Sequence, residues 1–153
     1  MRIRVELDSG VLEEEVVIRC SSFSEEVQRI QKMLADLAAG HQKFVFYKGD
    51  TEYYLPLEDI LFFETEEKVI FAHTKDAMYQ VKYRLYELEE FLPGHFMRIS
   101  KSTILNIHQI YSIRKNLASS SLVAFQNTHK QVFVSRHYYK PLKNKLEEKR
   151  NQI

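Results

Sequence analysis

The sequence is poor in residues that build covalent or metal-bound frameworks, with one cysteine, four glycines and no tryptophan among 153 residues. Cys20 cannot form an internal disulfide, and no second thiol accompanies it for a clustered metal site. So few glycines leave no glycine-rich loop of the kind that holds nucleotide phosphates. A run of about eighteen apolar residues is also missing, which excludes a helix that spans a membrane.

The start of the chain lacks the apolar core of a secretion signal, because Met1 is followed by alternating basic, apolar and acidic residues. We therefore expect a cytoplasmic protein. Hydrophobic residues make up 44% and charged residues 28% of the chain, as in ordinary globular proteins. The length suits one domain with a small extension, and it leaves no room for an added receiver domain controlled by phosphorylation.

The sequence shows no arrangement typical of an enzyme. Its six histidines are scattered, and no cysteine or carboxylate accompanies them at the spacing of metal ligands. Serine, histidine and aspartate are all present, but nothing in their order selects a catalytic set. We predict a protein that is not an enzyme and that uses no cofactor, no metal ion and no small-molecule substrate.

The charge is distributed very unevenly along the chain, although the net charge is only +1. Residues 1–97 hold 11 Lys/Arg and 19 Asp/Glu, which gives −8, whereas residues 98–153 hold 11 Lys/Arg and 2 Asp/Glu, which gives +9. A basic C-terminal third on an acidic body is the pattern expected of a protein with one surface for a polyanion. Acidic and basic segments that interleave in space would instead cancel this field.

Residues 1–42 predict a small β-β-α element. Apolar residues alternate with charged ones over residues 2–7, and residues 16–20 are rich in β-branched side chains, so each stretch predicts a short strand. A capping-box pattern at Ser22 and Glu25 begins a helix that we expect to run to about Ala39. Its apolar stripe fits packing on the small sheet, and a coiled-coil dimer seam is the alternative.

Residues 43–153 predict many short strands and few helices. Lys48-Gly49-Asp50 indicates a hairpin turn, and residues 60–63 form an apolar run typical of a strand buried on both faces. A short helix is expected over residues 85–92, and a basic helix from about Tyr138 to the C-terminus. The fold class is therefore mainly β with short helices, α+β overall.

Two separated segments carry side chains that could read DNA. Lys101 lies at a junction between two expected strands, and Arg136 lies where a strand gives way to the last helix. Lysine and arginine at such rigid edges can reach guanine in the major groove, while neighbouring hydroxyls and cations bind phosphates. The candidates for phosphate contact are Ser102, Lys115, Lys130, His137, Lys140 and Lys143.

The same two segments resemble the signatures of the LytTR-type DNA-binding domain. One signature reads arginine-x-hydroxyl-x-serine and then asparagine, as in residues 98–106, and the other reads serine-arginine-x-tyrosine, as in residues 135–138. Residues 57–64 resemble a third, earlier segment of that family. The resemblance spans about residues 43–150 and implies a ten-stranded β domain whose loops enter successive major grooves and bend the DNA.

This resemblance implies specific roles for three residues. The base-contacting positions of the family map onto Lys101 and Arg136, and a third position, in a hairpin turn, falls at Glu67 or Lys68, of which we choose Lys68. Members without a receiver domain resemble regulators that a membrane protein holds in check. We therefore expect double-stranded DNA as partner, a homodimer on repeated half-sites and, as a hypothesis, a membrane-protein inhibitor. Residues 1–42 would be either the docking surface for that inhibitor or the dimerisation surface.

Several residues in these segments have a structural interpretation instead. Arg98 could pair with a carboxylate inside the domain, and Asn106 could fix a turn through bonds to the backbone. Ser135 could cap the last helix, while Tyr138 and Leu142 are better suited to packing than to stacking on bases. If such roles dominate, the alternative function is a non-enzymatic β module with a basic surface that binds a protein or a small ligand. RNA binding would need aromatic residues exposed on a sheet face.

Overall fold

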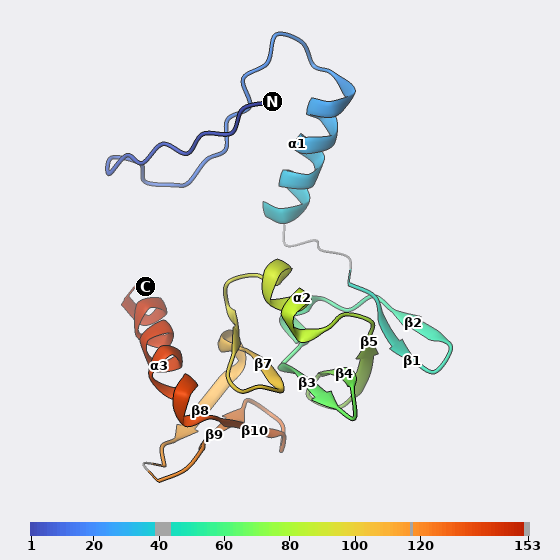
Figure 1. Cartoon of the computed structure of the whole chain (residues 1–153), viewed down its shortest axis with the longest axis vertical. Coiled ribbons are helices and arrows are strands. Elements are labelled where there is room, and N and C mark those ends of the chain that lie inside the picture. Colours follow the sequence, from blue (N-terminus) through green and yellow to red (C-terminus); the bar gives the residue numbers. More distant parts are fainter. Residues whose placement is uncertain (39–43, 117, 152–153) are drawn as a thin grey trace. The chain divides into compact units, whose positions relative to one another are not determined.

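Ten short strands and three α-helices form the described part of the chain, residues 1–38, 44–116 and 118–151 of a computed structural model (Figure 1). The helices are α1 (Glu25–Ala38), α2 (Leu85–Phe91) and α3 (Arg136–Asn151), and short 3-10 turns cover Leu57–Asp59 (η1) and Ile107–Gln109 (η2). The strands are β1 (Phe46–Lys48), β2 (Thr51–Tyr53), β3 (Phe62–Glu66), β4 (Val69–His73), β5 (Met78–Val81), β6 (Phe96–Arg98), β7 (Thr103–Asn106), β8 (Ile110–Arg114), β9 (Ser121–Phe125) and β10 (Gln131–Val134).

The strands form two antiparallel sheets. The larger sheet has seven strands in the order β2-β1-β5-β4-β3-β7-β6, and the smaller has three in the order β10-β9-β8. Short loops join most neighbours, which suits antiparallel pairing, and Gly49 takes the left-handed conformation that the β1–β2 turn requires (φ 61°). The predicted mainly β, α+β fold is confirmed.

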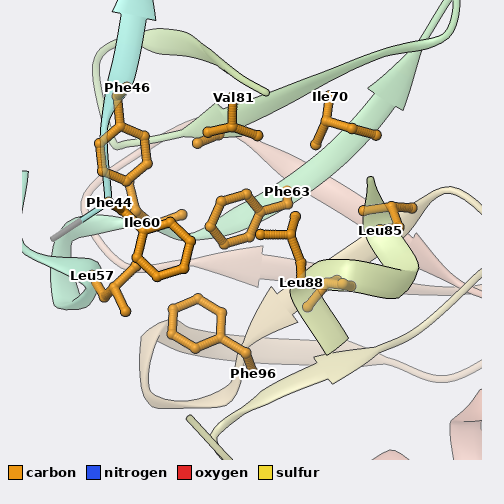
Figure 2. Packing of buried hydrophobic residues seen from close by; sticks show 12 residues of the cluster. Phe44, Phe46, Leu57, Ile60, Phe63, Ile70, Val81, Leu85, Leu88 and Phe96 are labelled. Carbon is orange, nitrogen blue, oxygen red and sulfur yellow. The ribbon is translucent and has the colours of Figure 1, made fainter. Parts of the chain in front are cut away.

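The first two residues of β3 and all of its neighbour β7 are buried, on both faces of the sheet. Phe63 and Ile104 point into one core, which α2 covers, whereas Phe62 and Leu105 point into a second core beneath the smaller sheet and α3. Figure 2 shows Phe63 near the centre of the first core. The apolar run at residues 60–63 is explained by this arrangement, since a strand with two buried faces has no polar position to alternate with.

The last helix begins earlier than the sequence predicts. It starts at Arg136 rather than near Tyr138, so Pro141 lies in its second turn and not in its first. Proline there cannot donate the bond that would otherwise reach the carbonyl of His137. The helix continues because Leu142 is fully buried in the second core, and this packing outweighs the missing bond.

The N-terminal unit corrects one prediction. The chain divides into two units, Met1–His41 and Gln42–Ile153, and the predicted boundary between residues 42 and 43 lies outside the described residues. Helix α1 confirms the predicted helix, but residues 1–24 contain no strand, so the two strands of the predicted β-β-α element are wrong. Ile3, Val5 and Leu7 are 90%, 81% and 96% exposed. An alternating pattern forms a stable strand only with partner strands and a face to bury, and two strands alone are marginal.

Candidate nucleic-acid interface

Two backbone hydrogen bonds align three turns along one edge of the C-terminal unit. The first joins the amide of Thr65, near the β3–β4 turn, to the carbonyl of Ser102 at the end of the β6–β7 loop (residues 99–102), over 2.8 Å. The second joins the amide of Ser135, at the β10–α3 junction, to the carbonyl of Ile99 in the same loop, over 2.9 Å. The β6–β7 loop therefore lies between the other two turns.

Each turn carries one of the three predicted base-contacting residues. Lys68 occupies the β3–β4 turn, Lys101 the β6–β7 loop, and Arg136 the first position of α3. All three side chains are exposed. The structure thus brings together residues that lie far apart in the sequence, in the spatial order Lys68, Lys101, Arg136.

The β3–β4 turn, which carries Lys68, has a left-handed backbone conformation. Glu67 and Lys68 both have positive φ, 49° and 71°. Two left-handed residues in a row define the tight hairpin turn whose twist matches the flanking strands. Glycine or asparagine usually occupies such positions, so two long charged side chains there carry a conformational cost. The turn holds Lys68 at the tip of the hairpin.

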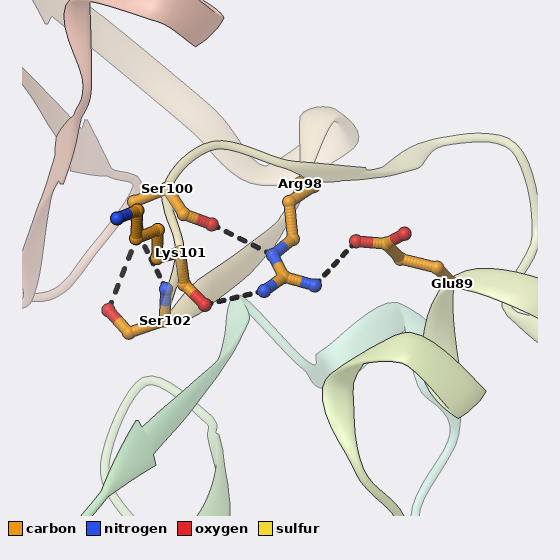
Figure 3. Close-up of polar contacts among 5 residues, drawn as sticks. All are labelled: Glu89, Arg98, Ser100, Lys101 and Ser102. Carbon is orange, nitrogen blue, oxygen red and sulfur yellow. Dashed lines mark hydrogen bonds and ion pairs between the residues drawn. The ribbon is translucent and has the colours of Figure 1, made fainter.

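Arg98 fixes the shape of the β6–β7 loop. Its guanidinium donates from Nε to the carbonyl of Ser100 over 2.8 Å and from Nη2 to the carbonyl of Lys101, and Nη1 lies 2.6 Å from the Glu89 carboxylate (Figure 3). The Ser100 hydroxyl also accepts from the amide of Ser102 over 3.2 Å. Arg98 therefore has the structural role that one interpretation of the sequence gives it. Its hydrogen bonds fix the backbone of the loop that carries the Lys101 side chain.

Helix α3 presents a basic face opposite its buried face. Arg136, Lys140 and Lys143 are spaced four and three residues apart, so they share one side of the helix. Leu142 is fully buried on the other side, where the half-buried Tyr138, Tyr139 and Leu146 pack against the second core. The packing interpretation of Tyr138 and Leu142 is therefore confirmed. His137 is exposed and its ring meets that of Tyr138 edge-on, with centroids 5.0 Å apart.

The remaining predicted phosphate contacts differ in position. Ser102 lies in the β6–β7 loop, and Lys115 follows β8 with its ammonium 5.3 Å from the ring centre of Tyr139, next to α3. Lys130 lies apart from both. Its ammonium donates to the carbonyl of Ala77 over 2.6 Å and is 3.3 Å from Nδ1 of His73. Burial lowers the pKa of Lys130, against the opposing effect of Asp76. This lysine joins the β9–β10 turn to the larger sheet.

A groove between β4, β5 and α2 opens beside the aligned turns, and the sequence did not predict it. Lys68 and Lys101 line it together with Arg98 and two further cations, Lys82 and Arg84. The last two follow β5 directly, at the start of α2, and both are exposed. Their signal in the sequence is weak, because Lys82 and Arg84 alternate with Tyr83 in a segment whose neighbours are acidic. We call this groove the cationic groove.

The described part of the chain contains neither a cluster of metal ligands nor a helix suited to a membrane. Within residues 1–38, 44–116 and 118–151, no group of three His, Cys, Asp or Glu side chains is arranged to hold a metal ion. Among the helices of those same ranges, none is both long and apolar enough to pass through a lipid bilayer.

Comparison with known proteins gives a consistent result. The family model described as "LytTr DNA-binding domain" matches residues 50–147, the part of the chain that holds all the candidate contacts. A solved structure from Bacillus cereus, described as the LytTr DNA-binding domain of a methyl-accepting/DNA response regulator, superposes with a TM-score of 0.61 at 25% identity. The match covers 65% of this chain and 92% of that one.

Curated relatives extend the likeness to nearly the whole chain. A protein of Staphylococcus aureus strain bovine RF122 / ET3-1, named "Uncharacterized HTH-type transcriptional regulator", is 29% identical over 95% of this chain and 98% of its own length. A protein of the same description from strain MRSA252 is 28% identical over the same shares. In the described part of this chain, every two successive α-helices are separated by strands, so no helix-turn-helix pair is formed there.

Proposed function

The chain belongs to the LytTr DNA-binding domain family, and on this premise we propose that it regulates transcription by reading a specific DNA sequence through its three aligned turns. The observation that carries the proposal is the pair of backbone hydrogen bonds, Thr65 to Ser102 and Ser135 to Ile99, which hold the turns in one row. A row of short cationic turns can enter the grooves of a duplex, where the base edges are exposed.

Each turn supplies one base-contacting residue in this proposal. Arg136 can form a bidentate contact with guanine, and Lys101 and Lys68 can each reach an acceptor on a base edge. Because Lys101 lies between the other two, it would read the central part of the site. Removal of one such contact costs about 1–3 kcal/mol and relaxes preference at one base pair.

Phosphate contacts surround these residues. Lys140 and Lys143 continue the basic face of α3 from Arg136, and His137 directly follows Arg136. Lys115 lies against Tyr139 of the same helix, and Ser102 follows Lys101 in the β6–β7 loop. Cations at these positions set affinity and register without reading sequence. We leave Lys130 out of this set, because its ammonium is held by the carbonyl of Ala77.

We further propose that two copies bind repeated half-sites in the cytoplasm, because one small module buries little surface on DNA. The N-terminal unit is suited to dimerisation: Met33 and Leu37 of α1 are 61% and 55% exposed, on a helix that buries little within its own unit. The curated relatives have the matching region, since the alignment covers 98% of their length. The same surface could instead receive a membrane-protein inhibitor. Sedimentation of the 153-residue chain, with and without DNA, separates dimerisation from inhibitor docking.

Selection of bound duplexes from a random pool tests the function directly. We expect the wild-type protein to enrich a motif with repeats about one helical turn apart. Arg136→Ala and Lys101→Ala should each reduce the sequence preference at a different base pair of that motif. Lys143→Ala should lower the affinity for all sequences alike. Lys75→Ala, an exposed lysine at the opposite end of β4, is the matched control.

The selection also separates the alternative function. If the wild-type protein enriches no sequence and binds random DNA with a steep dependence on salt, only a basic surface is present. The protein would then be better explained as a β module that binds a protein or a small ligand.

A further inference from the structure

The cationic groove continues the row of turns onto a part of the domain to which nothing above assigns a role. Its lining includes Lys68 and Lys101, the two base-contacting candidates nearest to it, so the groove and the turns form one surface. Ile70, Val81 and Leu85 line its floor and are at most 7% exposed, and the side chains of all three are seen in Figure 2. The floor belongs to the first core and is therefore rigid.

The charge of the groove is positive throughout. Five cations line it, and no aspartate or glutamate is among its described lining residues. Glu66 and Glu67 share a turn with Lys68 but do not line the groove. Arg98 is neutralised by Glu89 at 2.6 Å, which leaves the charges of Lys68, Lys82, Arg84 and Lys101 to face an anion.

Lys82 and Arg84 are held in place for such a contact. The ammonium of Lys82 lies 4.2 Å from the ring centre of Tyr47, which restrains the side chain without cancelling its charge. Arg84 precedes the first residue of α2, and its backbone amide donates to the Glu87 carboxylate over 3.2 Å. The backbone that carries the Arg84 guanidinium is therefore held at the start of a helix. Tyr86, which is 60% exposed, brings a hydroxyl to the lining, whereas the ring of Tyr83 packs edge-on against Phe44 and Phe91.

We infer that Lys82 and Arg84 bind the phosphate backbone of DNA that flanks the bases read by Lys68 and Lys101. This inference rests on the proposed function and extends its surface from three turns to the β5–α2 connection. Phosphate is the fitting ligand because cations and hydroxyls rim the groove above an apolar floor, and such a rim positions a backbone without reading its sequence. The groove is open and continuous with the turns, so a strand that leaves the turns can enter it.

The test compares the salt dependence of binding to the selected duplex. Lys82→Gln with Arg84→Gln removes two charges, and the slope of log affinity against log salt should become shallower by about 1.8, from about 0.9 for each phosphate contact. The selected motif should stay unchanged. Lys82→Arg with Arg84→Lys keeps both charges and should restore the wild-type slope.

The control variant is Lys48→Gln with Lys75→Gln. Lys48 also lies over a tyrosine ring, 5.0 Å from the centre of that of Tyr79, and neither lysine lines the groove. This control should leave the slope at the wild-type value, and circular dichroism should show that both glutamine variants fold. Trimming of the base pairs that flank the motif should abolish the difference between the Lys82/Arg84 variant and the wild type.

Two failures are distinguishable. A Lys82/Arg84 glutamine variant with the wild-type slope on a long duplex overturns this inference and leaves the proposed function standing. A wild-type protein that enriches no motif overturns the proposed function itself. Equal losses in the groove variant and in the control would show a general charge effect and would also overturn the inference.

Discussion

The side-chain amide of Asn106 donates a hydrogen bond to the backbone carbonyl of Ile60 over 3.0 Å, deep in the protein. The Asn106 side chain is fully buried, and its oxygen accepts from the amide of His108 over 3.0 Å. One side chain therefore joins segments that are 46 residues apart in the sequence and also closes the η2 turn. The expectation that Asn106 fixes a turn is confirmed, and the asparagine of the signature motif has a structural purpose.

Replacement of Asn106 should lower the stability of the fold. Asn106→Ala leaves the Ile60 carbonyl buried without this donor, which costs about 2 kcal/mol or more of unfolding free energy. Gln109→Ala is the matched control, because the Gln109 amide also donates to a backbone carbonyl, that of Glu58 over 2.7 Å, but near the surface. It should cost at most about 1 kcal/mol. Urea unfolding measures both, and equal losses would contradict the role given to Asn106.

Removal of the Ser135 amide should impair recognition more than stability. Ser135→Pro deletes the bond to the Ile99 carbonyl, and because Ser135 precedes α3 its amide donates no bond within the helix. If the lost hydrogen bond contributes about 1 kcal/mol to the alignment of the turns, the affinity for the specific site should fall about fivefold. Ser135→Ala keeps the backbone amide and should bind as the wild type does. Fluorescence anisotropy with specific and random duplexes separates a loss of specific recognition from a loss of general DNA affinity. Equally weaker binding to both duplexes would mean that alignment of the turns is not needed for specificity.

His73 should make the fold less stable in mild acid. Burial, and then the charge of Lys130, lower the pKa of His73 from 6.5 to about 4, and its side chain is only 14% exposed. Between these values the unfolded chain binds a proton that the folded chain does not, so unfolding free energy falls as pH falls from 6.5 to about 4. The full effect is about 3 kcal/mol, from about 1.4 kcal/mol for each pKa unit.

His73→Gln isolates this effect from that of its neighbours. Glu64, 4.0 Å away, has a pKa raised by burial and then by Glu66, which acts in the opposite direction, and it is present in both proteins. The wild-type protein should therefore lose more stability than His73→Gln does between pH 6.5 and about 4, in unfolding curves measured across the range. Parallel pH profiles would show that His73 does not titrate in this window.

Local pattern was enough to predict the strands of the C-terminal unit and the position of its signature segments. The apolar run at residues 60–63 and the turn at Gly49 each have a short-range cause, namely burial on both faces and a left-handed backbone. Arg98 was also interpretable, because an arginine between apolar neighbours needs a carboxylate nearby, and Glu89 supplies it.

Apart from the start of α3, the misses depend on contacts between distant segments. The alternating residues 2–7 carry the pattern of a strand, but no strand among the described residues pairs with them, and pattern alone cannot supply a partner. The ammonium of Lys130 is held by groups near residue 75 that no spacing rule connects to it. The cationic groove likewise joins residues from β4, α2 and the β6–β7 loop, so it exists only after the sheet has formed.

The burial of β3 on both faces has a mechanical consequence. A strand that supplies Phe63 to one core and Phe62 to the other cannot be released from one without exposing apolar surface of both. The two sheets should therefore melt as a single cooperative unit, with the slowest amide exchange at β3 and β7. The three turns are attached to strands β3 and β7, which belong to both cores. Their spacing should therefore persist until the whole domain unfolds.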